Sequence, residues 1–340
     1  MQWRRLLWPF SLIYDSITRI RNTAFDQGIL ASRSFDLPVI AVGNLSTGGT
    51  GKTPMVEFLL DRLKSYKRAV VSRGYGRKAS GLLIANPQHT AAQIGDEPLQ
   101  MYRKFPDIQM VLSEKRVLGL EALQENPPEV VILDDAFQHR YVKPGFQVLL
   151  TTFQDPFFKD FVLPAGNLRE SSRGKERADV ILVTKCPPDM NTGTADLYRS
   201  RIRPRKDQAV FFTSLEYGEP VNAHGITLPH GADVLAITGI ASPQPFTDHL
   251  SKGFTVAKHL NFEDHHHFSE ADIRQIETYL EQHPECPVIT TEKDLVRLLP
   301  LLSDKLKPRI FSLPIRVRFL FEEENTFMQR ITGFISGSPV

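Results

Sequence analysis

The sequence predicts an α/β fold with a mostly parallel, doubly wound sheet, followed by a second, smaller α/β domain. Over residues 23–215, short apolar runs typical of buried strands alternate with segments of helical spacing. One of these runs leads through a glycine-rich loop straight into a helical segment, as in P-loop folds. Residues 216–232 are rich in Gly, Pro, His and Asn and are predicted to be a linker. A second alternating set then begins, so we assign residues 233–340 to the smaller domain.

The glycine-rich loop consists of Ser46, Thr47, Gly48, Gly49, Thr50, Gly51, Lys52 and Thr53. A strand is predicted before it, at 37–42, and a helix after it, from Pro54. Glycines allow backbone N–H groups to point at phosphate oxygens, and a helix N-terminus adds partial positive charge. Lys52 would reach the β- and γ-phosphates, and the Thr53 hydroxyl would hold Mg²⁺. A turn with a solvated lysine is the alternative, but the flanking strand and helix favour a nucleoside triphosphate site.

The other elements follow in chain order. In the first domain, strands are predicted at 68–72, 82–84, 109–112, 130–135, 146–150 and 178–183, with helices opening at Gly95 and covering about 114–124. The apolar strand at 130–135 ends in Asp134 and Asp135, which is typical of the strand that brings an acid to Mg²⁺ beside a P-loop. In the second domain, strands are predicted at 234–239, 254–256 and 287–290 and helices at 243–250 and 269–282. Residues 308–321 are extended, and a final helix from Glu323 could pack on either domain.

Residues 1–22 combine basic and apolar side chains. Leu6, Phe10, Ile13, Ile17 and Ile20 fall on one helical stripe, and arginines and tryptophans lie among them. The apolar stretch is too short to span a bilayer and lacks the cleavage site of a signal peptide. The helix could pack on the protein's own core or lie in a membrane surface, and tryptophans so close to paired arginines favour the membrane.

Composition narrows the class of protein. With 340 residues, 41% of them hydrophobic and 24% charged, the chain has ordinary globular values and enough length for two domains. A net charge of +2 argues against a nucleic-acid-binding protein. Cys186 and Cys286 lie far apart, so neither a disulfide framework nor a cysteine zinc site is indicated, as expected for a reducing cytoplasm. We expect a monomer.

Three further groups of residues could carry chemistry. The run Asp264–His267 is the densest titratable cluster, and a metal site, a solvated loop, and a general base or its orienting partner all remain open. Asp96 and Glu97 are either helix-start residues or chemical groups. Three arginines either line an anionic substrate or are ordinary surface charges: Arg73, Arg77 and Arg116.

Seven short motifs occur in a fixed order along the chain. They are V-G-N-L-S-T-G-G-T-G-K-T-P (42–54), S-R-G-Y-G-R (72–77), G-D-E-P (95–98), D-D-A-F-Q-H-R (134–140), L-P-A-G-N-L-R-E (163–170), D-H-H-H-F (264–268) and T-E-K-D (291–294). From about residue 3 to residue 300, the chain resembles the tetraacyldisaccharide 4′-kinases, the lipid A 4′-kinases of Gram-negative bacteria. Ser46 stands where the general P-loop motif has Gly, and that family has Ser or Thr there.

The resemblance implies a P-loop kinase that moves the γ-phosphoryl group of ATP, with Mg²⁺, to the 4′-hydroxyl of a tetraacylated glucosamine disaccharide 1-phosphate. It implies a peripheral enzyme at the cytoplasmic face of the inner membrane, with residues 1–22 as a helix that docks on anionic lipids. The implied catalytic residues are Asp96 as base, His265 as the group that tunes it, and Lys52. The implied metal ligands are Thr53, Asp134, Asp135 and Glu170. The implied substrate-binding residues are Arg73, Tyr75, Arg77, Glu97, Arg116, Gln138, His139 and Arg169.

The residues can also be compared with two other classes of protein. A P-loop switch ATPase of the partition or metal-carrier kind has a similar loop, but it carries a lysine in the place of Thr47. A nucleotide-binding interaction module without chemistry would leave Asp96, Asp134, Asp135 and His265 without a purpose. The kinase accounts for all of these residues.

Overall fold

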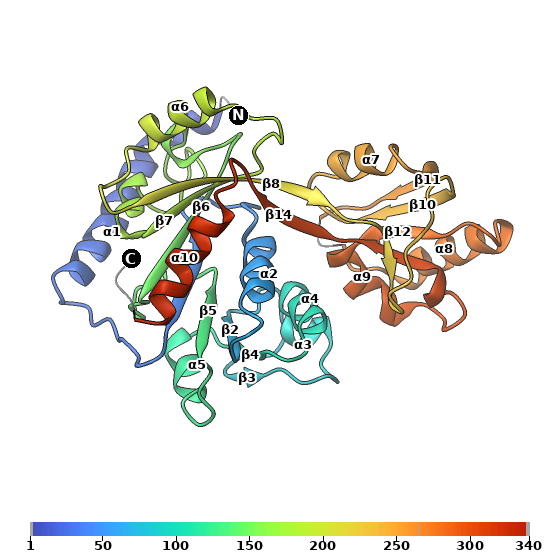
Figure 1. The fold of residues 1–340 in the computed structure, drawn as a ribbon, viewed down its shortest axis with the longest axis horizontal. Coiled ribbons are helices and arrows are strands. Elements are labelled where there is room, and N and C mark those ends of the chain that lie inside the picture. Colours follow the sequence, from blue (N-terminus) through green and yellow to red (C-terminus); the bar gives the residue numbers. More distant parts are fainter. Residues whose placement is uncertain (1–2, 265, 338–340) are drawn as a thin grey trace.

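The computed structural model describes residues 3–264 and 266–337, which form two α/β units, each built on one sheet (Figure 1). Within these residues the larger sheet has nine strands in the order β14-β8-β7-β6-β1-β5-β2-β4-β3. The strands are β1 (Val39–Asn44), β2 (Arg68–Ser72), β3 (Leu83–Ile84), β4 (Gln109–Leu112), β5 (Val130–Asp134), β6 (Phe146–Thr152), β7 (Val180–Thr184), β8 (Ala209–Tyr217) and β14 (Ile315–Phe319). Only the outer pairs β3–β4 and β8–β14 are antiparallel among them. The predicted mostly parallel α/β class is confirmed.

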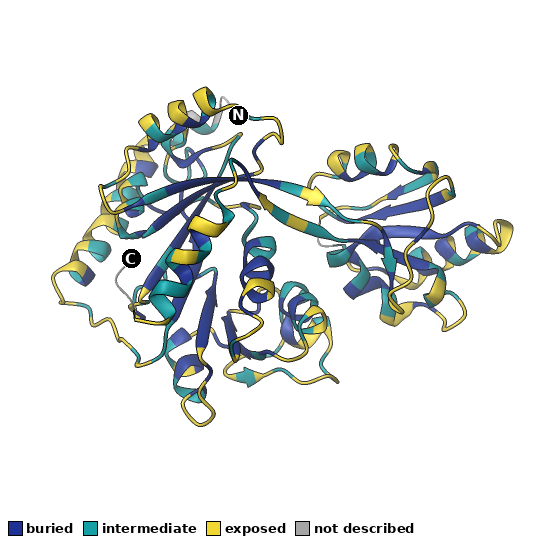
Figure 2. Cartoon of the chain, viewed as in Figure 1, coloured by how far each residue is buried: buried dark blue, intermediate teal, exposed yellow. Residues whose placement is uncertain are grey.

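Helices cover both faces of this sheet, as a doubly wound fold requires. One face packs against α2 (Lys52–Arg62), α4 (Asp96–Lys104) and α10 (Glu324–Ile335). The other face packs against α5 (Arg116–Ala122) and α6 (Thr192–Ile202). Shorter helical segments are α3 (Ala91–Ile94), η2 (Phe157–Lys159) and η3 (Ser172–Arg177). Because the central strands are apolar and covered on both faces, they are buried along their whole length (Figure 2).

The smaller sheet has the order β11-β10-β12-β13-β9. Its strands are β9 (Val221–Asn222), β10 (Asp233–Thr238), β11 (Thr255–Asn261), β12 (Val288–Thr291) and β13 (Ile310–Leu313). Its helical segments are α7 (Gln244–Leu250), α8 (Glu270–Gln282), α9 (Glu292–Leu298), η4 (Leu299–Leu301) and η5 (Lys307–Arg309). Strand β9 lies inside the stretch predicted as a linker and pairs with β13.

The chain passes between the two units twice, side by side. It leaves the larger sheet through β8 and returns through β14, and the two strands pair with Tyr217 opposite Ile315. Helix α10 follows and packs Phe327 and Ile331 into the core of the larger unit, so the C-terminal segment belongs to that unit (Figure 1). A second contact joins α4 to α9, where Lys104 Nζ lies 2.7 Å from Glu57 Oε2 and 2.8 Å from Glu292 Oε1.

The N-terminal segment forms η1 (Trp3–Leu7) and α1 (Trp8–Asp26). Polar contacts hold it to the larger unit: the Arg4 guanidinium donates to the Gly166 carbonyl oxygen over 2.6 Å and to Asn167 Oδ1 over 2.9 Å. The predicted apolar stripe does not pack on the core, because its five side chains are between 60% and 80% exposed. No helix in the described part of the chain combines the length and the apolar character that a membrane crossing needs.

Candidate functional site

The loop between β1 and α2 is curled by glycines and tied to neighbouring strands. Gly48 has a φ of 105° and Gly51 a φ of 84°, backbone conformations in which a side chain is strained. At the end of β1, Asn44 Nδ2 donates to Thr50 Oγ1 over 2.7 Å. At the end of β7, the Thr184 hydroxyl donates to the Thr50 carbonyl oxygen over 2.8 Å. The edge of the sheet therefore holds the loop in shape.

A third segment holds the first half of the loop. The Thr47 N–H donates to the Asn167 carbonyl oxygen over 2.7 Å, and the Arg169 N–H donates to the Leu45 carbonyl oxygen over 2.7 Å. Ser46 forms an isolated bridge with Leu168. The predicted loop 163–170 thus lies along the glycine-rich loop, where its side chains can reach a bound ligand.

The predicted nucleotide-binding residues form a suitable cradle for a triphosphate. Helix α2 begins at Lys52, so its unpaired N–H groups and its partial positive charge face the space in front of the loop. Lys52 Nζ lies 3.7 Å from Asp135 Oδ1, and its side chain is mostly buried. Thr53 is the next residue, in the first turn of the same helix. Amide donors, a helix N-terminus and a lysine are the groups that bind phosphate oxygens in P-loop proteins.

Asp134 and Asp135 end β5 beside this cradle, and their environments differ. Asp134 is buried and accepts a 2.9 Å hydrogen bond from the Ser72 hydroxyl. Burial, with added repulsion from Glu97 and Asp135, raises the pKa of Asp134 to about 6. Burial also raises the pKa of Asp135, but Lys52 and Arg169 outweigh it, and the net pKa lies below the ordinary value.

A divalent cation fits this arrangement. The described residues contain no cluster of three or more His, Cys, Asp or Glu side chains that could hold a metal by themselves. Mg²⁺ does not need one, since it commonly takes one or two carboxylates and completes its shell with phosphate oxygens and water. The buried Asp134 carboxylate repels Glu97 and Asp135, and a cation would relieve that repulsion.

The placement of Glu170 does not match its predicted role as a metal ligand. Its carboxylate is buried and accepts hydrogen bonds from Arg177 at both oxygens, over 2.7 and 3.0 Å. Asn22 Nδ2 donates to Oε2 over 2.7 Å, and Gln138 Nε2 donates to Oε1 over 3.0 Å. Four donors occupy the four lone-pair directions of a carboxylate. Glu170 instead connects α1 to the site.

Arg116 also differs from its predicted place on the substrate side. Its guanidinium is buried and donates to the carbonyl oxygens of Ser113 and Asp134, over 3.0 and 3.1 Å. Its own N–H donates to His139 Nε2 over 3.3 Å. Burial, with repulsion from Arg116, Arg21 and Arg73, lowers the pKa of His139 to about 4, so this imidazole is neutral near pH 7. Through these hydrogen bonds, Arg116 and His139 hold the carboxyl end of β5 in place.

The other predicted substrate residues lie on loops around the cradle. Arg73 and Tyr75 are exposed in the turn after β2, and Tyr75 is 77% exposed. The Arg77 side chain is almost fully buried in an ion pair with Glu114. Arg169 Nη1 lies 3.0 Å from Asp135 Oδ1 and 3.4 Å from Gln138 Oε1. Arg73, Tyr75 and Arg169 are thus the members of this set that a large ligand can reach most directly.

Asp96 and Glu97 open helix α4, with Gly95 as N-cap. Charge repulsion from Glu97 adds to the effect of burial in raising the pKa of Asp134. Asp96 Oδ2 lies 3.6 Å from Nε of Arg297, a residue of α9 in the smaller unit. His265, the predicted partner of Asp96, lies outside the described residues. Its neighbour His266 stacks on Phe262 and pairs with Asp272 at 3.0 Å.

Arg297 is a residue that the sequence-based prediction missed. It is 7% exposed, and it donates to the carbonyl oxygens of His266 and Gly239 and to Asp294 Oδ1. Asp294 is completely buried and closes the T-E-K-D motif. The motif is visible in the sequence, but nothing there indicates that an arginine three residues later contacts Asp96 from the other unit.

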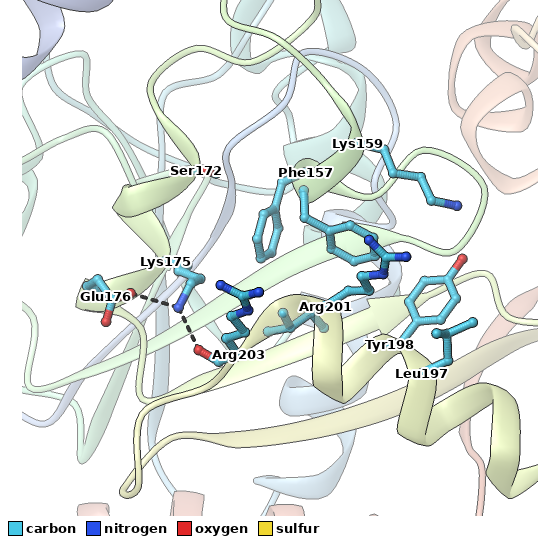
Figure 3. Close-up of a pocket in the computed structure, with 11 residues that line it drawn as sticks. Phe157, Lys159, Ser172, Lys175, Glu176, Leu197, Tyr198, Arg201 and Arg203 are labelled. Atoms are coloured by element: carbon cyan, nitrogen blue, oxygen red, sulfur yellow. Dashed lines mark hydrogen bonds and ion pairs between the residues drawn. The ribbon is translucent and has the colours of Figure 1, made fainter.

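One cavity in the described part of the chain contains none of the predicted site residues. It has a volume of about 670 Å³ and lies between α6 and the segments η2 and η3 (Figure 3). Phe157 and Tyr198 line it, together with Lys159, Arg201 and Arg203.

Comparison with known proteins gives matches over nearly the whole chain. The model of the family described as tetraacyldisaccharide-1-P 4′-kinase matches residues 3–336. A tetraacyldisaccharide 4′-kinase of Bacteroides thetaiotaomicron is 44% identical over 351 residues, which cover 97% of this chain and 92% of that protein. One of Flavobacterium psychrophilum is 44% identical over 349 residues, 98% of each chain. The crystal structure of LpxK from Aquifex aeolicus in complex with ATP has a TM-score of 0.78 at 32% identity and covers 97% of this chain and 99% of that one.

Proposed function

The chain belongs to the tetraacyldisaccharide-1-P 4′-kinase family, and from this premise we propose how its residues perform the reaction. The protein is an ATP-dependent kinase that phosphorylates the 4′-hydroxyl of a tetraacylated glucosamine disaccharide 1-phosphate in lipid A biosynthesis. The observation that carries the proposed mechanism is the meeting of three elements at one edge of the larger sheet. These are the glycine-rich loop with Lys52, the carboxylate end of β5, and the acidic start of α4.

The loop Ser46–Thr53 binds the triphosphate through its N–H groups, and Lys52 contacts the β- and γ-phosphates. The Thr53 hydroxyl and the Asp134 carboxylate would hold Mg²⁺, and a bound Mg²⁺ would supply neutralisation of the phosphate charge. Asp135 stays ionised between Lys52 and Arg169 and orients both cations. Most of the rate enhancement comes from such positioning and charge neutralisation, since phosphoryl transfer needs little covalent help.

Asp96 is the base that accepts the proton of the 4′-hydroxyl, with His265 as its partner from the smaller unit. The salt bridge from Arg297 to Asp96 supports this arrangement, because it ties the start of α4 to the loop that follows β11. The base would be fully assembled only when the two units lie against each other. Movement about β8 and β14 would then couple acceptor binding to phosphoryl transfer and limit wasteful hydrolysis of ATP.

The substrate approaches from the side of the exposed turn after β2. Arg73, Tyr75 and Arg169 contact the disaccharide phosphate, and Glu97 and Gln138 line the same opening. Arg77, Arg116 and His139 act from behind this surface by holding the loops that carry it. An arginine that is already bonded to backbone carbonyls fixes a loop more than it recruits a ligand.

The exposed apolar stripe of α1 supports docking on a membrane. Ile13, Ile17 and Ile20 are between 60% and 71% exposed, and arginines flank them along the helix. Such a helix lies in the interface of a bilayer that contains anionic lipids. The acyl chains of the substrate stay in that bilayer, so we place the enzyme at the cytoplasmic face of the inner membrane as a peripheral protein.

The test is direct transfer of label. Purified protein is incubated with γ-labelled ATP, Mg²⁺ and a detergent-dispersed tetraacylated disaccharide 1-phosphate, and the lipid product is analysed. Label on the 4′-oxygen is expected for the wild type and not for Lys52→Ala. Release of label only as inorganic phosphate, independent of the lipid, would contradict the kinase and favour a switch ATPase.

A further inference from the structure

Lys185 is a cation at the glycine-rich loop that the predicted site does not include. It follows β7 directly and has a φ of 56°, in the left-handed region that residues other than glycine rarely adopt. Its Nζ lies 3.8 Å from the position that a Cβ on Gly49 would occupy. The preceding residue, Thr184, donates to the Thr50 carbonyl oxygen, so the turn that carries Lys185 is anchored to the same loop.

The Lys185 ammonium is held there without a counter-ion. Across residues 3–264 and 266–337 its Nζ makes no hydrogen bond or ion pair. Burial lowers the pKa of Lys185, and no carboxylate offsets that effect. Lys185 as a whole is exposed, so its ammonium can be reached from solvent. Its placement next to Gly49 makes it available to a ligand that is bound on the loop.

Strand order shows which end of the nucleotide lies at Lys185. On one side of β1 lies β5, which ends in Asp134, followed by β2, β4 and β3. Asp96 lies in the connection between β3 and β4. On the other side lie β6 and β7. The γ-phosphate must face the acceptor and its base, on the β5 side. An extended triphosphate on the loop then points its nucleoside toward β7 and Lys185.

We propose that Lys185 contacts the nucleoside end of ATP, with its ammonium beside the ribose and its methylene stem against one face of the adenine ring. Lysine suits both contacts, because its stem is apolar and its ammonium can donate hydrogen bonds to the ribose oxygens. The inference rests on the proposed function, since the placement of Asp96 sets the direction of the triphosphate.

The experiment compares nucleotide binding in four proteins by calorimetry: wild type, Lys185→Ala, Lys185→Met and Lys206→Ala. The ligands are ATP, ADP and inorganic tripolyphosphate, each with Mg²⁺. Lys206 is a matched control, an exposed lysine of the same unit in the connection between α6 and β8. Lys185→Met keeps most of the stem without the charge. Because Lys185 has no partner among the described residues, melting temperatures should match the wild type in every variant.

The expected result is a loss of about tenfold in ATP and ADP affinity for Lys185→Ala, which corresponds to about 1.4 kcal/mol. Lys185→Met should lose less, and tripolyphosphate affinity should not change. In turnover, the KM for ATP should rise while kcat stays constant. An equal loss of tripolyphosphate affinity would overturn the nucleoside contact, and unchanged ATP affinity would overturn any contact. A wild type that binds ATP but does not phosphorylate the lipid would defeat the proposed function and leave the binding comparison valid.

Discussion

Replacing Asp134 by Asn tests whether a buried negative charge is held in the site for a cation. The Asp134 carboxyl has its pKa raised from 3.8 to about 6, chiefly by burial and then by Glu97 and Asp135. A shift of about two units corresponds to about 3 kcal/mol. Because the folded state holds this proton more tightly than the unfolded state, the ionised carboxylate destabilises the fold. The penalty is absent below about pH 4, grows through about pH 6 and is complete above it.

Asp134→Asn removes the charge and can still accept the hydrogen bond from Ser72. Without ligand at pH 8, the variant should therefore be more stable than the wild type by up to about 3 kcal/mol. That difference raises the melting temperature by about 2–4 °C for each kcal/mol in a unit of this size. At pH 4.5 the penalty falls to about 1 kcal/mol, because the folded carboxyl is then largely protonated, so the two proteins should melt within about 4 °C of each other. Phosphoryl transfer should be lost.

The assay is differential scanning calorimetry at pH 4.5 and pH 8, with and without Mg²⁺ and ATP. Asp36→Asn is the control, because Asp36 is exposed and remote from the cluster; it should show no pH-dependent difference. Mg²⁺ and ATP should stabilise the wild type more than the variant, and the difference between their melting temperatures at pH 8 should become smaller. Asp134→Asn could instead be less stable than the wild type at pH 8, or its melting temperature could differ from that of the wild type by the same amount at both pH values. Either result would refute the interpretation that the fold holds a buried negative charge for a cation.

Four further outcomes are expected from the site and from α1. Asp96→Asn should lower kcat by about 10²–10⁴ without changing ATP affinity, the range for a lost general base, and near-normal turnover would remove Asp96 from that role. Arg297→Lys should lower kcat at unchanged ATP affinity, because one ammonium cannot reach Asp96, the His266 carbonyl and Asp294 together; equal turnover would make the contact incidental. Glu170→Gln should lower the melting temperature without shifting the Mg²⁺ concentration for half-maximal activity, whereas a shift would restore Glu170 as a metal ligand. Ile13→Ser combined with Ile17→Ser should weaken sedimentation with anionic vesicles at unchanged melting temperature, and full binding would mean that the stripe has another partner.

Local signals in the sequence were sufficient for the fold class and the nucleotide loop. Strand, glycine loop and helix start are adjacent in the chain, and each depends on short-range chemistry: the dihedral freedom of Gly48 and Gly51, and the helical spacing after Pro54. The acidic end of β5 was equally visible, because an apolar strand that ends in two aspartates needs no tertiary information. The prediction that ATP and phosphoryl transfer are the chemistry of this chain followed from these local signals and from the ordered motifs.

Tertiary structure decided the environment of each side chain. Asp134, which we propose as a ligand of Mg²⁺, and Glu170, which is bonded to Arg177, both carry a carboxylate, so only packing separates their environments. The charge of Arg116 predicts a place on the substrate side, but the residue is buried and bonded to the end of β5. Arg297 and Lys185 reach the site from elements far away in sequence, through the crossovers of a parallel sheet and the contact between two units. Such contacts depend on which distant segments pack together. A single sequence shows composition and spacing, but it does not show which segments pack against each other.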